Sequence, residues 1–523
     1  MVVLGATASC TDTVYRDRPG GGFVAPPEAA AGFLGFSQED TKQTVCGNCH
    51  VGQQTQWAST AHADAWATLE ASGHAQDFCR ECHSVNQKGN TSDVQGGWVT
   101  TKDTRYHDVQ CESCHGPGIN HVEDPSAKKP LAPLGVSIDT SANPPLTYGC
   151  GDCHNGVHHP YVEQWAMSPH AMASEHSKER QAEAASCGAA CHTGQGALER
   201  NLTKDAGTNY VEKVATITPQ NALPITCAVC HDPHEKKYEG QLRVAVNGTV
   251  AQENLCANCH NRRGSPSGTA TSDWRGPHAP EWETVDGTAG WWPPSLGAEV
   301  PLKSTHGSEK NPNMCATCHV RRFDVTDSTG ASFTSVGHLF LAIPCLDASG
   351  KPTADNSCAL AATARDFGGC AGAGCHAPQS AAGALVSATV NTTLLLETLE
   401  ELFARIPCSE FDPNDGKWTV AEGAHFNYQL AAMRSLQEEI DSRPPAGAAA
   451  CAFTVSGSTV DTRAVRPPEA WTGQVVHSPF LIQALLAGSI REIKNTYGLS
   501  ASAAANAAVN ATLAKARADG TIK

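Results

Sequence analysis

The sequence has few aromatic and few charged side chains for its length. Aromatic residues make up 6% of its 523 residues, charged residues 17% and hydrophobic residues 40%. A chain of this size that packed a core from its own side chains would need more large apolar groups. Basic residues are outnumbered 37 to 53, and the formal net charge of -16 argues against a nucleic-acid partner. We expect something other than side chains to fill part of the interior.

Cysteine and histidine, by contrast, are abundant, with 23 of each. Many of them share the spacing C-x-x-C-H, for which composition alone would produce about 0.04 matches. The seven regular motifs are Cys46/Cys49/His50, Cys79/Cys82/His83, Cys111/Cys114/His115, Cys150/Cys153/His154, Cys227/Cys230/His231, Cys256/Cys259/His260 and Cys315/Cys318/His319. Two wider versions, with three and four intervening residues, are Cys187/Cys191/His192 and Cys370/Cys375/His376.

This spacing suits covalent haem attachment. Two thiols add to the two vinyl groups of a haem, and the adjacent histidine binds the iron as its proximal ligand. Zinc knuckles also use paired C-x-x-C motifs, but zinc does not require a histidine directly after each second cysteine. We therefore expect nine haem c groups, attached through these 18 cysteines and ligated by the nine motif histidines.

Fourteen further histidines compete for the distal position on each iron. The chain has five methionines and no C-x-x-C-K motif, which argues against methionine ligation and against a lysine-ligated catalytic haem. Nine distal histidines would close every iron, as in electron transfer, whereas a catalytic haem keeps one face open. The candidates are His62, His74, His107, His121, His158, His159, His170, His176, His234, His278, His306, His338, His425 and His477.

Local context favours some of these candidates. His121 follows a Gly-Pro-Gly turn after the third motif, and His234 lies three residues beyond His231, too close to bind the same iron. His62 and His170 occur in a repeated phrase in which Trp-Ala is followed by His-Ala. The phrase indicates an internal repeat of a haem-carrying unit.

The spacing of the motifs predicts the organisation of the chain. Residues 1–45 carry no motif and are expected to be a linker, possibly the remnant of a lipoprotein. Residues 46–376 form the nine-haem region, where too little chain separates the motifs for conventional domains. Residues 377–523 form a helical region that supplies distal histidines and caps the haem array. The fold class is therefore mainly α with extensive irregular loops and little β, with haems as the core.

Apolar periodicity predicts three helices in the last part. Leu395, Leu399, Leu402 and Ile406 form one stripe, and Phe426, Leu430, Met433 and Ile440 approximate a second. A third runs from Ile482 to Tyr497, with Ser478 as N-cap, Pro479 as first residue and Gly498 as stop. His425 and His477 precede two of these helices, which would present them to a haem. Ser500 to Ala518 is alanine-rich and also expected to be helical, and Trp291 and Trp292 are expected either to stack on haem faces or to join a core.

Five cysteines remain outside the motifs: Cys10, Cys345, Cys358, Cys408 and Cys451. The last four allow three disulfide pairings, of which proximity along the chain favours Cys345–Cys358 and Cys408–Cys451. Haem attachment takes place outside the bacterial cytoplasm, so export is expected. The first residues lack a basic region and are too short for a signal peptide, which suggests a misplaced start or a trimmed chain. Cys10 resembles a lipidation site.

Several phrases resemble the multihaem c-type cytochromes of respiratory bacteria. They are CESCHGPGINH (111–121), CHNGVHHPYVEQWAMSPH (153–170), CAVCHDPH (227–234), RGPH (275–278), CATCH followed by GHLF (315–340) and VVHSPFLIQALL (475–486). The resemblance implies electron transport through closely packed bis-histidine haems. It suggests as distal ligands His121, His159, His170, His234, His278, His338 and His477, to which His62 and His306 are added to make nine.

Two functions follow from the resemblance. Some relatives are outer-surface cytochromes that deliver electrons to extracellular acceptors, and some of these polymerise into filaments. Others are octahaem oxidoreductases of small nitrogen or sulfur compounds, an alternative that requires one open iron. We expect an exported electron conduit, extracellular, at the outer-membrane surface or periplasmic, whose partners are redox proteins, extracellular acceptors or further copies of itself. Propionates would deepen its negative charge and favour metal ions or basic partner proteins.

Overall fold

A computed structural model describes most of the chain from residue 30 onward. The described residues are 30–126, 129–135, 138–139, 146–147, 149–156, 160–172, 189–202, 217–218, 222–266, 276–301, 303–322, 324–326, 332–334, 336–350, 352, 358, 363–371, 375–433, 442–455, 457–466 and 473–523. Cys10, Cys187, His158, His159 and His176 lie outside these residues.

The chain divides into two compact units. Residues 1–133 and 138–152 form unit 1, and residues 134–137 and 153–523 form unit 2. The predicted helical part, residues 377–523, thus belongs to the same unit as most of the motifs.

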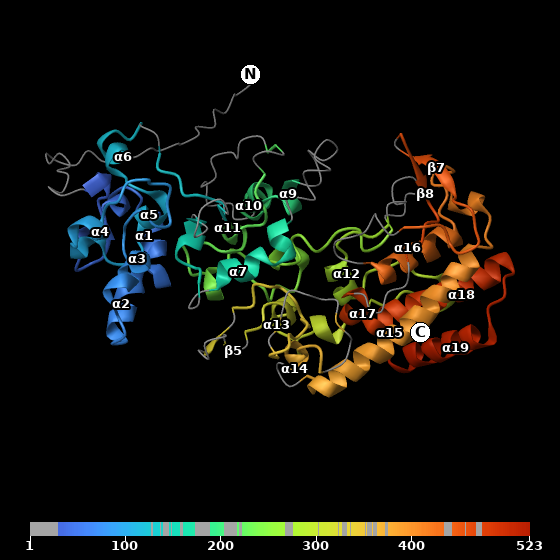
Figure 1. Ribbon diagram of the computed structural model, residues 1–523. Helices are drawn as coiled ribbons and strands as arrows, with labels where there is room; N and C mark the ends of the chain where they lie inside the picture. The colour runs from blue at the N-terminus through green and yellow to red at the C-terminus, as the bar shows by residue number, and fades with distance from the viewer. Residues whose placement is uncertain are drawn as a thin grey trace, which may run out of the picture. The chain divides into compact units, whose positions relative to one another are not determined.

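Unit 1 consists of short helices joined by irregular loops (Figure 1). Its α-helices are α1 (Val51–Trp57), α2 (Ala65–Ala71), α3 (Arg80–His83), α4 (Trp98–Thr101), α5 (Cys111–His115) and α6 (Ile119–Glu123). Its strands form two antiparallel pairs, β1 (Phe36–Gln38) with β2 (Gln43–Thr44) and β3 (Ile138–Asp139) with β4 (Leu146–Thr147). No helix among these exceeds two turns, because the motifs and glycine-rich loops interrupt the chain too often.

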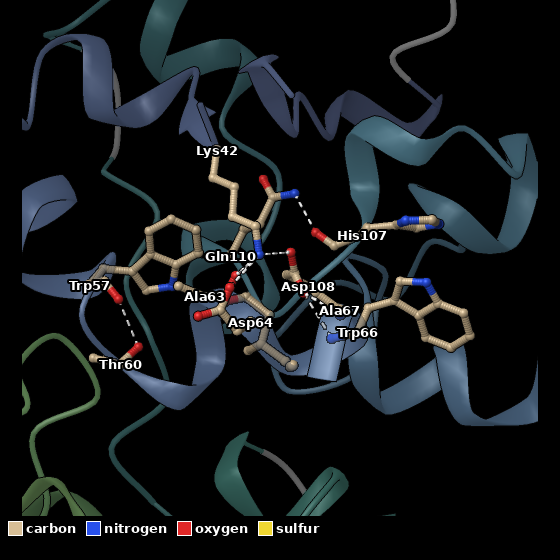
Figure 2. Close-up of polar contacts among 12 residues, drawn as sticks. Lys42, Trp57, Thr60, Ala63, Asp64, Trp66, Ala67, His107, Asp108 and Gln110 are labelled. Carbon is tan, nitrogen blue, oxygen red and sulfur yellow. Dashed lines mark hydrogen bonds and ion pairs between the residues drawn. The ribbon is translucent and has the colours of Figure 1, made fainter. Parts of the chain in front are cut away.

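A polar network around Lys42 joins several segments of unit 1 (Figure 2). Lys42 Nζ donates to the Ala63 carbonyl at 2.7 Å and forms ion pairs with Asp64 at 2.6 Å and Asp108 at 3.0 Å. Asp108 also accepts a hydrogen bond from the Trp66 amide at 2.8 Å. These contacts hold the start of α2 to the loop that leads into the third motif.

Unit 2 continues this pattern as far as the ninth motif. Its short α-helices are α7 (Tyr161–Ala166), α9 (Ala189–His192), α10 (Gly194–Leu202), α11 (Cys227–Cys230), α12 (Glu281–Asp286), α13 (Cys315–His319) and α14 (Gly368–Ala371). Its strands pair antiparallel as β5 (Asp324–Thr326) with β6 (Ser332–Thr334) and β7 (Ala452–Val455) with β8 (Ser458–Asp461). The described residues are mainly helical with little sheet, as predicted.

The last part of unit 2 contains the long helices. They are α15 (Pro378–Phe403), α16 (Val420–Ala432), α17 (Gly473–His477), α18 (Pro479–Tyr497) and α19 (Ala503–Ala518). Helices α15, α16 and α19 pack against α18 (Figure 1). Their apolar faces form the largest core among the described residues. By length and composition α15 could cross a membrane, yet its second half lies in this core, where Leu395, Leu399 and Leu402 are fully buried.

The predicted helices are found, although one of them ends earlier than predicted. Helix α18 begins at Pro479 after Ser478 and ends before Gly498, whose φ of +65° is the left-handed conformation that glycine adopts readily. The Ser478 side chain makes no capping hydrogen bond. Helix α16 ends at Ala432, earlier than its predicted stripe. It begins with a capping box between Thr419 and Glu422 that the sequence analysis missed.

Both favoured disulfides are confirmed. Cys345 pairs with Cys358, and Cys408 pairs with Cys451. Of the two readings of Trp291 and Trp292, core packing is found, because both rings lie against the large core of unit 2.

Candidate haem-ligand pairs

Several of the described motifs lie wholly or partly on a short helical turn. Helix α5 spans the whole phrase Cys111–His115, and α13 spans Cys315–His319. In α5 the turn begins after Gln110, whose side chain forms a reciprocal capping box with Ser113. A three-residue offset places the two sulfurs near one another on a helical turn, as attachment to the two vinyl groups of one haem requires.

The motif histidines are oriented by hydrogen bonds at Nδ1. This nitrogen faces the Ala65 carbonyl oxygen in His83 at 2.9 Å and the Pro130 oxygen in His115 at 2.9 Å. It faces the Gly240 oxygen in His231 at 2.7 Å and the Phe340 oxygen in His319 at 2.8 Å. A carbonyl can only accept, so these contacts select the tautomer with Nδ1–H and leave the Nε2 lone pair available for a metal.

Six motif histidines each face a second histidine from elsewhere in the chain. The ring centres lie 6.0 to 6.5 Å apart in all six pairs. The pairs are His50 with His121 (6.4 Å), His192 with His278 (6.1 Å), His231 with His338 (6.0 Å), His260 with His170 (6.3 Å), His319 with His477 (6.3 Å) and His376 with His306 (6.5 Å).

This separation fits an iron between the two rings. Metal–imidazole bonds of about 2.0 Å on opposite sides of one ion would hold the two ring centres about 6 Å apart. Direct stacking of two imidazoles would bring them closer, and unrelated histidines would show no common distance. The donor set, two thiols and two facing imidazoles, is that of a bis-histidine haem c.

The six partner histidines are all members of the predicted distal set. They are His121, His170, His278, His306, His338 and His477. His234 instead has its Nδ1 3.1 Å from Asp232 and a half-exposed side chain. His62 is not in these pairs, and His159 lies outside the described residues. The motif histidines His83, His115 and His154 are likewise not in the six pairs. Ligation itself remains a prediction for every member of the set.

His425 was expected to be presented to a haem, and its surroundings do not fit that expectation. The residue lies within α16, and its Nε2 is hydrogen-bonded to the Ala464 carbonyl oxygen at 2.7 Å. Phe403, Phe411 and Tyr428 surround the ring. The nitrogen that would bind iron is therefore already used, and the position belongs to the apolar core.

Burial keeps four of the partner histidines neutral. It lowers the pKa of His170, His278, His338 and His477 to about 4, because a buried imidazolium loses its hydration. A protonated imidazole cannot bind a metal. These four side chains are therefore in the ligating form at neutral pH.

Cysteines from different motifs approach one another. In unit 1 the thiol of Cys46 lies close enough to that of Cys111 for the pair to raise the pKa of Cys46, and in unit 2 the thiols of Cys191 and Cys259 likewise influence each other's pKa. Cys256 and Cys315 influence each other's pKa in the same way. Because each sulfur marks the edge of a porphyrin, these contacts would place attached haems edge to edge.

The other described motif cysteines are not members of these three sulfur pairs. They are Cys49, Cys79, Cys82, Cys114, Cys150, Cys153, Cys227, Cys230, Cys318, Cys370 and Cys375. Their surroundings differ, because the side chains of Cys49 and Cys375 are exposed whereas those of Cys82 and Cys153 are partly buried. Haem attachment at these positions, as at every other motif cysteine, stays a prediction that rests on the spacing of the motifs.

Two family models match parts of the chain that carry these motifs. A family model described as cytochrome c554 and c-prime matches residues 45–116, and a doubled CXXCH motif matches residues 224–265. The chain is related to multihaem c-type cytochromes.

Two curated relatives are themselves such cytochromes. The C-type polyheme cytochrome OmcB of Geobacter sulfurreducens is 25% identical over 288 residues, which cover 46% of this chain and 35% of OmcB. The multiheme cytochrome MtrA of Shewanella baltica is 24% identical over 257 residues, covering 46% of this chain and 66% of MtrA. The chain thus spans about a third of OmcB. The solved structure of the outer cell wall cytochrome OcwA aligns with a TM-score of 0.44 at 16% identity, covering 81% of this chain and 78% of OcwA.

The paired histidines also make three contacts that the sequence analysis missed. Phe340 packs edge-on against His170, with the ring centres 4.5 Å apart, and Tyr161 packs edge-on against His338, with the ring centres 5.2 Å apart. Glu281 lies 3.4 Å from Nδ1 of His260. No local pattern marks these residues, because each contact joins positions far apart in the chain.

Proposed function

We propose that this protein conducts electrons along a row of nine covalently attached bis-histidine haems. The six facing histidine pairs carry the proposal, since a closed iron exchanges electrons without binding a substrate. The sulfur contacts between motifs support close haem spacing. The role of the chain is to fix the ligands, set the spacing and exclude water from the irons.

The proposal extends to the compartment and the partners. Two disulfides favour an oxidising location, and covalent haem attachment requires export. Export would place the protein at the outer surface or in the periplasm. With a net charge of -16, the protein would exchange electrons with basic redox proteins or with metal ions as extracellular acceptors.

One ligand substitution tests the proposal. His477→Ala should open a single iron, so that electron paramagnetic resonance of the oxidised protein gains one high-spin signal while the wild-type spectrum is entirely low-spin. His425→Gln is the matched control, because that buried histidine faces no motif and should leave the spectrum unchanged. Intact mass measures the number of attached haems, and nine are expected.

Two results would contradict parts of the proposal, and a third measurement decides whether the chain forms a filament. A His477→Ala spectrum without a high-spin signal would contradict the ligand pairing. A high-spin, cyanide-binding haem in the wild type would favour the alternative, an oxidoreductase of small nitrogen or sulfur compounds. Polymers in negative-stain images of the secreted protein would assign the chain to a filament, whereas globular particles alone would exclude that role.

A further inference from the structure

The acceptor at Nδ1 of His260 differs from that of the neighbouring motif histidines. His231 and His319 each face a neutral backbone carbonyl, at 2.7 Å and 2.8 Å. His260 instead faces Oε2 of Glu281 at 3.4 Å. The motif of His260 thus has a carboxylate beside Nδ1 of its expected proximal histidine.

Two hydrogen bonds from different segments hold Glu281 beside His260. Glu281 is the first residue of α12, and the Trp282 amide next to it donates to the His260 carbonyl at 3.0 Å. Its other oxygen, Oε1, accepts a hydrogen bond from Gln474 Nε2 at 3.2 Å. The carboxylate is therefore held against the histidine by two separate segments.

The oxygen that faces His260 is buried and unsatisfied. Among the described residues, Oε2 of Glu281 has no hydrogen-bond partner. An unpaired buried carboxylate oxygen is costly, and the Nδ1–H of His260 is positioned to satisfy it with a small rotation of the ring. This oxygen points to a contact that forms when His260 is held at its iron through Nε2.

A carboxylate at this position changes the ligand as well as orienting it. A charged acceptor pulls the Nδ1–H proton more strongly than a carbonyl does, which makes Nε2 a stronger donor to a metal. A negative charge close to the iron also favours the ferric over the ferrous state. Both effects lower the reduction potential of the haem bound between His170 and His260.

We propose that Glu281 is a positioning residue that lowers the potential of the haem held by His260 and His170 below the potentials of the haems at His231 and His319. The inference rests on the proposed function. It gives one position in the row a lower potential than its neighbours, so that the chain imposes an uneven energy profile on one-electron transfer. No proton is gained or lost in this step, because Glu281 stays ionised and the iron alone changes its oxidation state.

The test uses the intact, haem-loaded protein and measures each haem potential by spectroelectrochemical titration. Glu281→Gln should raise the potential of one haem and shift one low-spin signal in electron paramagnetic resonance. Glu281→Asp keeps the charge at a greater distance and should produce a smaller shift in the same direction. Glu283→Gln is the matched control on the same helix, because Glu283 bonds the Gly264 amide instead and should leave all potentials unchanged.

Unchanged potentials and signals in a fully haem-loaded Glu281→Gln protein would overturn the assignment. If that variant failed to incorporate all haems, Glu281→Asp would carry the test. A raised potential for one haem would then support the assignment, and wild-type potentials throughout would overturn it.

A second variant separates this inference from the proposed function. His170→Ala should open the same iron and produce a high-spin signal. If His170→Ala stays entirely low-spin, the ligand pairing fails. If it becomes high-spin while Glu281→Gln leaves the potentials unchanged, only the role of Glu281 is lost.

Discussion

In residues 378–523, apolar side chains from α15, α16, α18 and α19 form one continuous core. In the motif-bearing residues before them, most buried apolar side chains fall into clusters of two to four, such as Phe33, Val85, Trp98 and Tyr106. Clusters of this size cannot offset the conformational entropy of so long a chain. The contrast indicates that haem supplies the missing apolar volume in the motif region, while the helical part relies on its own side chains.

The largest expected effect is a difference in protease sensitivity between the two regions when haem is absent. We expect the chain produced in a host without haem attachment to lose protease protection throughout residues 46–376, because the small clusters lack their porphyrin partners. Residues 378–523 should remain protected by their own core. Limited proteolysis followed by mass spectrometry measures both, and equal sensitivity of the two regions would contradict the comparison.

A cavity in the helical core should have a smaller effect, a loss of stability confined to the helical region. Leu399→Ala should lower the free energy of unfolding of this region by about 2–5 kcal/mol, since Leu399 is fully buried. Hydrogen exchange of α16 and α18 measures the loss, and the haem absorption spectrum should not change. The exposed Leu131→Ala serves as control and should have no effect on exchange. A changed haem spectrum in Leu399→Ala would show that the core also sets haem ligation.

The smallest expected effect is a pH dependence confined to the start of α16. Burial raises the pKa of Glu422 to about 7, from an ordinary value of 4.5. The folded state therefore binds more protons than the unfolded state between these values, and stability falls as the pH rises from 4.5 through 7. Glu422→Gln keeps an acceptor for the Thr419 amide and should remove this fall.

Hydrogen exchange of α16 across this pH range checks the prediction. The exposed Glu397→Gln on α15 is the control and should retain the wild-type slope. A slope that persists in Glu422→Gln would assign the pH dependence to another group.

The same two regions differ in how well the sequence predicted them. Helix α18 was predicted to the residue, because Ser478, Pro479 and Gly498 mark its ends locally. The periodicity of α16 was visible as well, yet it could not show that His425 bonds the Ala464 carbonyl and joins the core. A histidine before an apolar stripe looks the same in sequence whether it serves a metal or a core.

The sequence by itself predicted the haem attachment chemistry and the proximal histidines, and it determined the pairing favoured for the disulfides. All of these depend on residues a few positions apart or on the nearest remaining partner along the chain. Only the tertiary structure decided which distal histidine faces which motif, such as His121 with His50 or His170 with His260. The tertiary structure also places the Glu281 carboxylate beside Nδ1 of His260. These contacts join distant segments, and their geometry is set by packing and loop paths that no local pattern encodes.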